Sequence, residues 1–167
     1  MANDKILIRL ANDADFDAIF LIWLDGIENS FDKNTFDEAV LKEKFNLNFN
    51  NREGIFNFWV AILGNEIIGW QSLIKTSYNP FRENTYAESS TYIKRNCRFK
   101  GLGQLLIAYV MKEAENSQLE YVIGFISVSN LAARKITKET GWVEVGEVPP
   151  SLKGSNNYPK ILLMKPV

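Results

Sequence analysis

Residues Arg98-Phe99-Lys100-Gly101-Leu102-Gly103 stand between a strand-like segment and an amphipathic helix that opens at Gly101. The first turn of a helix leaves several backbone N–H groups without intrahelical partners, and these groups carry partial positive charge. Glycine at positions 101 and 103 lets an anion approach that backbone closely, because no Cβ stands in the way. The segment therefore predicts a cradle for a pyrophosphate group.

Other interpretations of this segment compete with the cradle. A tight strand-to-helix turn would use glycine for its geometry alone, and these six residues do not exclude it. The dinucleotide fingerprint G-x-G-x-x-G requires a third glycine, but position 106 is Leu106. The Walker pattern is absent, since no Gly-Lys-Ser/Thr follows. The surrounding sequence has to decide between a plain turn and an anion site.

The pattern of apolar residues predicts strands and helices in the order β-α-α-β-β-β-α-β-α-β-β. Strands are expected over residues 5–10, 58–63, 66–75, 87–94, 121–127, 143–148 and 160–165, and helices over 14–27, 35–45, 101–117 and 130–140. This order predicts an α/β fold built on one mixed sheet.

Local signals support several of these boundaries. Gly64-Asn65 is typical of a two-residue hairpin loop, and Thr35 with Glu38 of a helix capping box. Gly141 suits the position just after a helix. The helix after Gly101 is expected to bury one face, which carries Leu102, Leu105, Leu106, Tyr109 and Val110.

Length and composition indicate one domain over residues 1–167, because 46% hydrophobic residues suffice for a core. The net charge is -1 without a basic stripe, so no nucleic-acid partner is expected. No apolar stretch approaches the roughly 18 residues of a membrane span, so no membrane association is expected. The single cysteine and the absence of a signal-peptide pattern predict a cytoplasmic protein.

The chain contains no histidine, and this excludes several catalytic mechanisms. A Ser-His-Asp triad, a Cys-His pair and a histidine-ligated zinc site are impossible. A general base has to be a carboxylate, a tyrosine, a lysine or a relayed water. With Cys97 as the one cysteine, a thiolate cluster is excluded as well, and no metal is expected.

Two motifs, which follow the fourth and the fifth expected strand, resemble motifs of the GCN5-related N-acetyltransferase (GNAT) family. Its Arg/Gln-x-x-Gly-x-Gly/Ala motif after the fourth strand is matched by Arg98, Gly101 and Gly103. Its Asn after the fifth strand, opening a helix that ends in Gly-aromatic, is matched by Asn130 and Gly141-Trp142. The resemblance implies one mixed, mostly antiparallel central sheet of about seven strands, flanked by about four helices and splayed between strands 4 and 5. It also implies acetyl-CoA as co-substrate, without a metal.

Within that family the chain is similar to the phosphinothricin N-acetyltransferase group. The similarity rests on Ala87-Glu88-Ser89-Ser90-Thr91-Tyr92-Ile93, with support from Gly146-Glu147-Val148 and Leu162-Leu163-Met164. It implies transfer of acetyl, by direct attack, to the primary amine of a small amino-acid-like acceptor such as phosphinothricin or methionine sulfone. It also implies a homodimer.

The family resemblance assigns a cofactor-binding set. The backbone at Ile93 and Lys94 is expected to pair with the pantetheine arm, and the Ile93 N–H to face the carbonyl oxygen that becomes an oxyanion. Asn130 is expected to hydrogen-bond the pantetheine arm, to cap its helix, or both. The expected contacts are Ile93, Lys94, Arg98, Phe99, Lys100, Gly101, Leu102, Gly103, Gln104, Asn130 and Ala133.

Glu88 is the candidate general base. A carboxylate inside an otherwise uncharged strand is expensive to bury unless it is used or paired, and an exposed or salt-bridged Glu is the alternative. Strand alternation places it on one face with Ser90 and Tyr92, where it could act directly or through a water.

The general acid is a point at which this chain departs from the family. Many family members carry a tyrosine at the position of Thr137, and the phosphinothricin group carries a histidine there. Threonine is a poor acid. Tyr92 or water could take over the protonation of the leaving thiolate.

Two loop residues are candidates for acceptor binding. Arg82, before the fourth strand, could hold a substrate carboxylate with its bidentate guanidinium, although a solvated side chain is the alternative. Phe31, between the first two helices, could line the acceptor pocket together with the candidate base Glu88.

Other functions stay open. The same fold could acetylate a protein or peptide N-terminus or a lysine, or it could be a non-catalytic acyl-CoA-binding module. The Thr137 departure and the absence of histidine keep the second possibility open. A dinucleotide-dependent oxidoreductase is disfavoured by the failed fingerprint and by the expected antiparallel hairpin.

Overall fold

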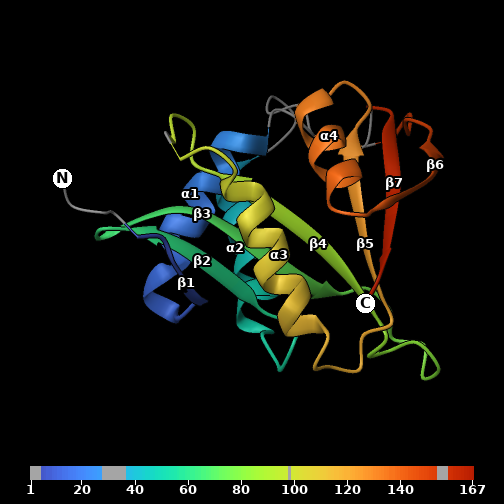
Figure 1. Cartoon of the computed structure of the whole chain (residues 1–167), viewed down its shortest axis with the longest axis horizontal. Coiled ribbons are helices and arrows are strands. Elements are labelled where there is room, and N and C mark those ends of the chain that lie inside the picture. The colour runs from blue at the N-terminus through green and yellow to red at the C-terminus, as the bar shows by residue number, and fades with distance from the viewer. Residues whose placement is uncertain (1–4, 28–36, 98, 154–157) are drawn as a thin grey trace.

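One sheet with the strand order β1-β2-β3-β4-β5-β7-β6 forms the centre of the molecule, and helices cover both of its faces (Figure 1). The computed structural model describes residues 5–27, 37–97, 99–153 and 158–167. Neighbouring strands pair antiparallel except β4 and β5, which run parallel. The strands are β1 (Leu7–Leu10), β2 (Phe58–Leu63), β3 (Glu66–Lys75), β4 (Tyr86–Ile93), β5 (Tyr121–Ser127), β6 (Val143–Val148) and β7 (Lys160–Pro166).

Four α-helices and a short 3-10 helix complete the described part of the chain. They are η1 (Asp13–Asp15), α1 (Phe16–Gly26), α2 (Glu38–Asn50), α3 (Leu102–Ala114) and α4 (Leu131–Glu139). The α/β class, the seven-stranded mixed sheet, the four helices and the parting of β4 from β5 confirm the predicted fold class. No helix within the described ranges is long and apolar enough to span a bilayer.

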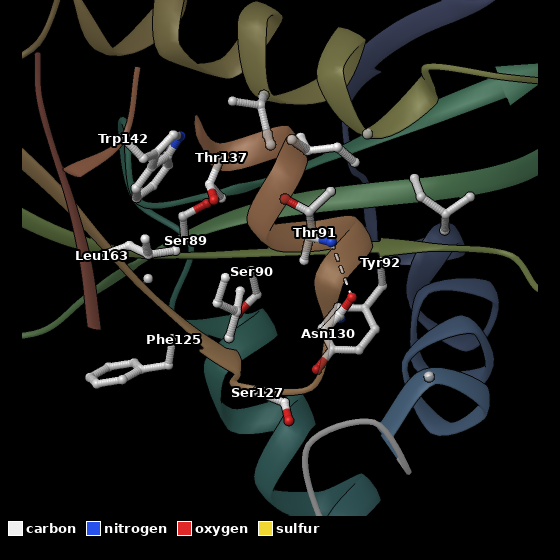
Figure 2. A pocket seen from close by; sticks show the side chains of 18 of the residues that line it. Ser89, Ser90, Thr91, Tyr92, Phe125, Ser127, Asn130, Thr137, Trp142 and Leu163 are labelled. Carbon is white, nitrogen blue, oxygen red and sulfur yellow. Dashed lines mark hydrogen bonds between the residues drawn. The ribbon is translucent and has the colours of Figure 1, made fainter. Parts of the chain in front are cut away.

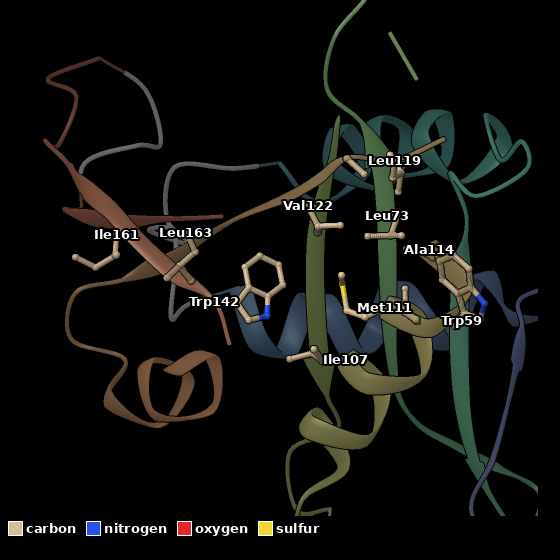
Figure 3. Packing of buried hydrophobic residues seen from close by; sticks show 12 residues of the cluster. Trp59, Leu73, Ile107, Met111, Ala114, Leu119, Val122, Trp142, Ile161 and Leu163 are labelled. Carbon is tan, nitrogen blue, oxygen red and sulfur yellow. The ribbon is translucent and has the colours of Figure 1, made fainter. Parts of the chain in front are cut away.

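Helices on the two faces of the sheet bury two separate sets of apolar side chains. Helices α1 and α2 pack Ile19 and Phe49 against Phe58 and Trp70 on one face. On the other face, α3 lies across the sheet, and its side chains share a cluster with Trp59, Leu73 and Val122 from the strands (Figure 3). Burial of each such side chain contributes roughly 1.5–3 kcal/mol. The sheet is therefore held from both sides at the place where β4 and β5 part.

The predicted helix over residues 35–45 begins and ends elsewhere. Asp37 caps α2, because its carboxylate accepts from the N–H of Ala39 at 2.8 Å and of Val40 at 3.3 Å. Thr35 of the predicted capping box lies outside the described residues. The helix continues to Asn50, since Phe49 buries its ring against Phe58 with centroids 5.3 Å apart.

The buried face of α3 differs from the predicted one. Leu105 and Tyr109 are 40% and 38% exposed, and Ile107 and Met111 are buried in their place. Every residue from Leu105 to Met111 is apolar, so periodicity within this run could not select the stripe that meets the sheet. The buried set is Leu102, Leu106, Ile107, Val110, Met111 and Ala114.

Locally determined features occur where they were predicted. The hairpin between β2 and β3 turns at Gly64-Asn65, with Leu63 opposite Glu66 and Gly64 at φ +62. Helix α4 follows Asn130 as its N-cap and is succeeded by Gly141 at φ +81. Both depend on residues that are adjacent in sequence, so the patterns could specify them.

Candidate active site

A wedge opens where β4 and β5 separate. The two strands pair only from Tyr86 opposite Tyr121 to Glu88 opposite Ile123, and the remainder of β4 has no β5 partner. Strand β5 stays paired with β7 along its whole length, so it diverges from β4 together with β7. A cavity of about 330 Å³, called here the cleft cavity, occupies the wedge. Its wall comes mainly from β4, β5, α3 and α4, with Gly26, Trp142 and Leu163 added from neighbouring segments (Figure 2).

The backbone of β4 presents polar groups to this wedge. The N–H of Lys94 donates to the carbonyl of Ile68 at 2.9 Å, which makes them a hydrogen-bonded pair of the β3–β4 ladder. Residues in an antiparallel ladder alternate between hydrogen-bonded and non-hydrogen-bonded pairs. Ile93 and Thr91 fall in the second class, so their N–H groups point away from β3, toward the side from which β5 has diverged.

The N-terminus of α3 borders the same cavity. Gly101 adopts φ +82 as the N-cap and offers no side chain to the free N–H groups of the first turn. Gly103 lines the cavity, and a Cβ built on it would meet only the Ile136 Cδ1 atom, at 3.8 Å. Backbone N–H groups are thus accessible at the N-terminal end of a 13-residue helix, as an anion cradle requires.

Helix α4 forms the opposite wall through Asn130, Ala133 and Thr137. The Asn130 Oδ1 atom accepts from the N–H of Ala133 at 3.1 Å, so it caps the helix and leaves its amide NH₂ as a donor (Figure 2). The Thr137 hydroxyl donates to the carbonyl of Arg134 at 3.0 Å. Because this hydrogen bond already uses the hydroxyl proton, Thr137 is poorly placed to donate a proton, in addition to being a weak acid.

A second cavity of about 650 Å³ lies on the other side of β4. Its walls include six aromatic side chains from the sheet and from α1 and α2, and it is called here the aromatic cavity; these side chains are Trp23, Phe45, Phe58, Trp70, Tyr92 and Phe125. Glu88, Ser90, Tyr92 and Phe125 line both cavities. The two spaces therefore meet at this short part of β4 and β5.

Tyr92 is held firmly at this junction. Its ring stacks on Trp70 with centroids 5.0 Å apart and an interplanar angle of 24°. The ring also lies against the end of α1, where a Cβ at Gly26 would come within 2.7 Å of the Tyr92 Cδ1 atom. Only glycine allows that approach, so α1 helps to fix the phenol.

Glu88 is a half-buried carboxylate that feels the positive charge of Lys160. Burial raises its pKa above the ordinary value, and the positive charge of Lys160 opposes that rise. Burial lowers the pKa of Lys160, and the negative charge of Glu88 opposes that change. A carboxylate whose pKa is raised toward neutral pH is a better general base than an exposed carboxylate with its ordinary pKa. The exposed-residue alternative for Glu88 is thereby disfavoured.

The floor of the aromatic cavity contains a buried hydroxyl. Ser72 lies opposite Ser90 in the β3–β4 register, between the pair Trp70–Tyr92 and the pair Ile74–Glu88. Its Oγ atom has no hydrogen-bond partner among the described residues. A buried polar atom of this kind is uncommon and indicates a place for a water or a ligand group.

The structure brings together some of the predicted site residues. Ile93, Gly103, Asn130 and Ala133 line the cleft cavity. Glu88 and Tyr92 line both cavities. Their roles stay predictions, but all six line the cleft cavity, and Glu88 and Tyr92 also form part of the wall of the aromatic cavity.

Other predicted cofactor contacts lie beside the cavities without lining them. Lys94 pairs through its ammonium with Glu66, and Gln104 donates to Glu139 at 2.8 Å. The side chain of Leu102 is buried in the core. Phe99, Lys100 and Gly101 precede α3, where the backbone rather than the side chains could meet an anion.

Three predicted residues are not placed at the site. Arg82 is exposed in the loop between β3 and β4 and lines neither cavity, so its position does not support the predicted carboxylate contact. Phe31 and Arg98 lie outside the described residues.

Sequence reasoning missed Lys160, Ser72 and Trp70. Lys160 precedes the apolar run Ile161–Met164, and Ser72 lies within the largely apolar strand β3, so each carried a weak signal of a polar residue next to the core. Trp70 carried none, because a tryptophan in a strand is more often part of the core. Among the described residues, no group of three or more Cys, Asp or Glu side chains could hold a metal ion.

Comparisons with known proteins agree with this geometry. The family model described as "Acetyltransferase (GNAT) family" matches residues 17–142. A comparison with curated proteins gave no match.

Several solved structures are similar over nearly the full chain. One, provisionally called a phosphinothricin N-acetyltransferase, is 23% identical with a TM-score of 0.81, covering 98% of this chain and 99% of that one. Ribosomal-protein-alanine N-acetyltransferase from Brucella melitensis is 26% identical, with a TM-score of 0.77 and coverages of 96% and 99%. YncA from Salmonella typhimurium, solved with acetyl-CoA, is 19% identical, with a TM-score of 0.77 and coverages of 97% and 94%.

Proposed function

Since the chain belongs to the acetyltransferase (GNAT) family, we propose that it transfers acetyl from acetyl-CoA to the primary amine of a small amino-acid-like acceptor. The observation that carries this proposal is the meeting of two cavities at one edge of β4. One cavity begins at a helix N-terminus, and the other is lined by the half-buried carboxylate of Glu88. A donor and an acceptor could therefore approach the same point from opposite sides of the strand.

The cleft cavity fits the donor. Acetyl-CoA supplies the thioester whose acetyl group is transferred. The first turn of α3 would hold the pyrophosphate through its backbone, and the amide NH₂ of Asn130 would donate to the pantetheine arm. The N–H of Ile93 would donate to the thioester oxygen as negative charge develops on it.

The aromatic cavity fits the acceptor, and Glu88 is the base. An ammonium has to lose a proton before its nitrogen can attack a carbonyl carbon. Glu88 would accept that proton, directly or through a water beside Ser72 and Ser90. The C–N bond then forms as the C–S bond breaks. A thiol with a pKa of about 8.5 leaves with little help, and Tyr92 or water would protonate the thiolate.

The phosphinothricin type of acceptor is the more specific part of the proposal. It is supported by the similarity in β4 and by the 23% identical structure of that name. It is supported also by the presence of one anionic and one cationic side chain in the aromatic cavity, as a zwitterionic amino acid would require.

The test combines binding with turnover. Thermal unfolding with and without acetyl-CoA is followed by thiol release against phosphinothricin, methionine sulfone and the standard amino acids. We expect a higher melting temperature with acetyl-CoA and thiol release on at least one free amino acid. A shift without release on any amine would favour the non-catalytic acyl-CoA-binding module. No shift would contradict the donor site itself.

A second candidate function is acetylation of a protein or peptide N-terminus. A third cavity of about 490 Å³, polar and rich in asparagine, shares Asn48, Phe58 and Ile74 with the aromatic cavity. The shared wall extends the space along α2, where a longer acceptor would fit. The 26% identical Brucella enzyme has a name of this type. A peptide that begins with alanine, added to the same panel, would distinguish the two acceptor classes.

A further inference from the structure

The aromatic cavity has an unusual charge pattern. Its described wall contains one anionic side chain, Glu88, and one cationic side chain, Lys160, and every other member is uncharged. Apart from the six aromatic residues named above, the uncharged members are Asn48, Ser72, Ile74, Ser90, Val148, Pro149, Ser151 and Tyr158.

The register of the sheet places Glu88 and Lys160 on the same face, with the position of Phe125 between them. Glu88 pairs with Ile123 of β5, and Phe125 lies two residues further along β5 on the same side. Phe125 pairs with Leu162 of β7, and Lys160 lies two residues before Leu162, again on that side. Glu88 and Lys160 are therefore contributed by β4 and β7 and flank the Phe125 position on β5.

This arrangement matches a ligand that carries both charges. A ligand with only a positive charge would satisfy Glu88 but would meet the like charge of Lys160 in the same cavity. A carboxylate on the same ligand removes that repulsion and gains a charge-assisted hydrogen bond. The aromatic walls leave room for an apolar or flat remainder rather than for further charge.

Building on the acetyl-transfer function above, we propose that Lys160 binds the carboxylate of the acceptor while Glu88 faces its ammonium. The acceptor class is then a free α-amino acid with an uncharged side chain, which favours the methionine sulfone type over phosphinothricin, because the phosphinate of phosphinothricin adds a second negative charge. Lys160 takes the role that the sequence had assigned to Arg82, which lies on the surface away from both cavities. A peptide N-terminus lacks the carboxylate at that position, so the proposal also separates the two acceptor classes.

The experiment assays each of three related acceptors with the wild type and with variants of the enzyme. L-phenylalanine, L-phenylalaninamide and L-phenylalaninol are compared as acceptors for the wild type, Lys160→Met and Lys160→Arg, with kcat/KM measured by thiol release. Lys112→Met, at an exposed position of α3, is the matched control for loss of a lysine. Acetyl-CoA affinity and melting temperature are measured for every variant, which verifies folding and the donor site.

We expect the wild type to prefer the free acid over both uncharged analogues by at least about tenfold. Lys160→Met should lose at least about tenfold in kcat/KM on the acid and change less than about threefold on the analogues, so that the preference disappears. Lys160→Arg should keep the preference, and Lys112→Met should behave as the wild type.

The result that would contradict Lys160 as the carboxylate anchor differs from the result that would contradict the acetyl-transfer proposal. Equal use of acid and amide by the wild type, or equal losses on both in Lys160→Met, would exclude Lys160 as the carboxylate anchor while acetyl transfer stands. Absence of thiol release on every amine of both panels would overturn the acetyl-transfer proposal, and the anchor with it.

Discussion

The N–H of Lys94 donates to the carbonyl of Ile68 at 2.9 Å, and this bond sets the direction of the Ile93 N–H. If the ladder were shifted by one residue, Ile93 would bond to β3 and Lys94 would face the wedge. The pairing of β3 with β4 thus positions a donor at the wall of the cleft cavity. A strand can supply such a donor only where its next neighbour has parted from it, as β5 has done here.

Replacement of Glu88 by Gln should lower kcat by about 10²–10⁴, the usual contribution of a positioned acid or base. The amide keeps the shape of the side chain but cannot accept the proton. Steady-state kinetics and titration calorimetry would be compared with Glu113→Gln, at an exposed position of α3. Acetyl-CoA affinity should change less than about twofold. An unchanged kcat would remove Glu88 from the role.

The pH dependence of stability should also change in the same variant, because the contribution of Glu88 to it is removed. The pKa of Glu88 is raised above its reference value of 4.5, so the folded protein binds more protons than the unfolded chain between the two values. Stability contributed by this group therefore falls as pH rises through that window. Glu88→Gln should melt above the wild type at pH 8, and the difference should shrink toward pH 4. An advantage that grows on acidification would contradict the direction of the shift.

Glycine at position 103 should matter for acetyl-CoA more than for folding. Gly103→Glu places a negative charge and bulk at the first turn of α3, so acetyl-CoA affinity should fall more than about tenfold. Gly103→Ala should fold with equal or greater stability, by up to about 1 kcal/mol, because glycine is a poor helix former and the site has space.

Gly146→Glu adds the same charge in β6, at an uncrowded position, and serves as the matched control. Calorimetric titration gives the affinities, and denaturant unfolding gives the stabilities. A folded Gly103→Glu protein with wild-type affinity would rule out the backbone cradle.

Ser72→Ala should be neutral or should stabilise the protein by up to about 1–3 kcal/mol, because it removes a buried hydroxyl without a described partner. Ser127→Ala offers the contrast, since the Ser127 Oγ atom lies 2.9 Å from the Ser129 Oγ atom. That variant should lose about 0.5–1.5 kcal/mol. Urea unfolding measures both. A loss above about 1 kcal/mol in Ser72→Ala would mean that a bound water satisfies the hydroxyl in solution.

Predictions from sequence succeeded where neighbouring residues decide the structure. The Gly64-Asn65 hairpin and the Asn130-capped helix depend on contacts within a few residues. The start of α2 was predicted wrongly, because Asp37, two residues after Thr35 in the sequence, is also a favourable N-cap residue and is the one that caps this helix. The buried face of α3 was predicted wrongly at Leu105 and Tyr109, because the unbroken apolar run from Leu105 to Met111 carries no pattern that distinguishes its sides.

By itself, the sequence determined the fold class, the glycines before and within α3, the place of the candidate base Glu88 in β4 and the absence of histidine chemistry. These follow from local periodicity, from turn residues and from residue types. Only the tertiary structure decided that Lys160, and not Arg82, lies at the aromatic cavity with Glu88. The two residues are brought together by the non-local pairing of β4 with β5 and of β5 with β7. Strand alternation predicts the face on which a side chain lies, but it does not predict which distant strand will lie beside it.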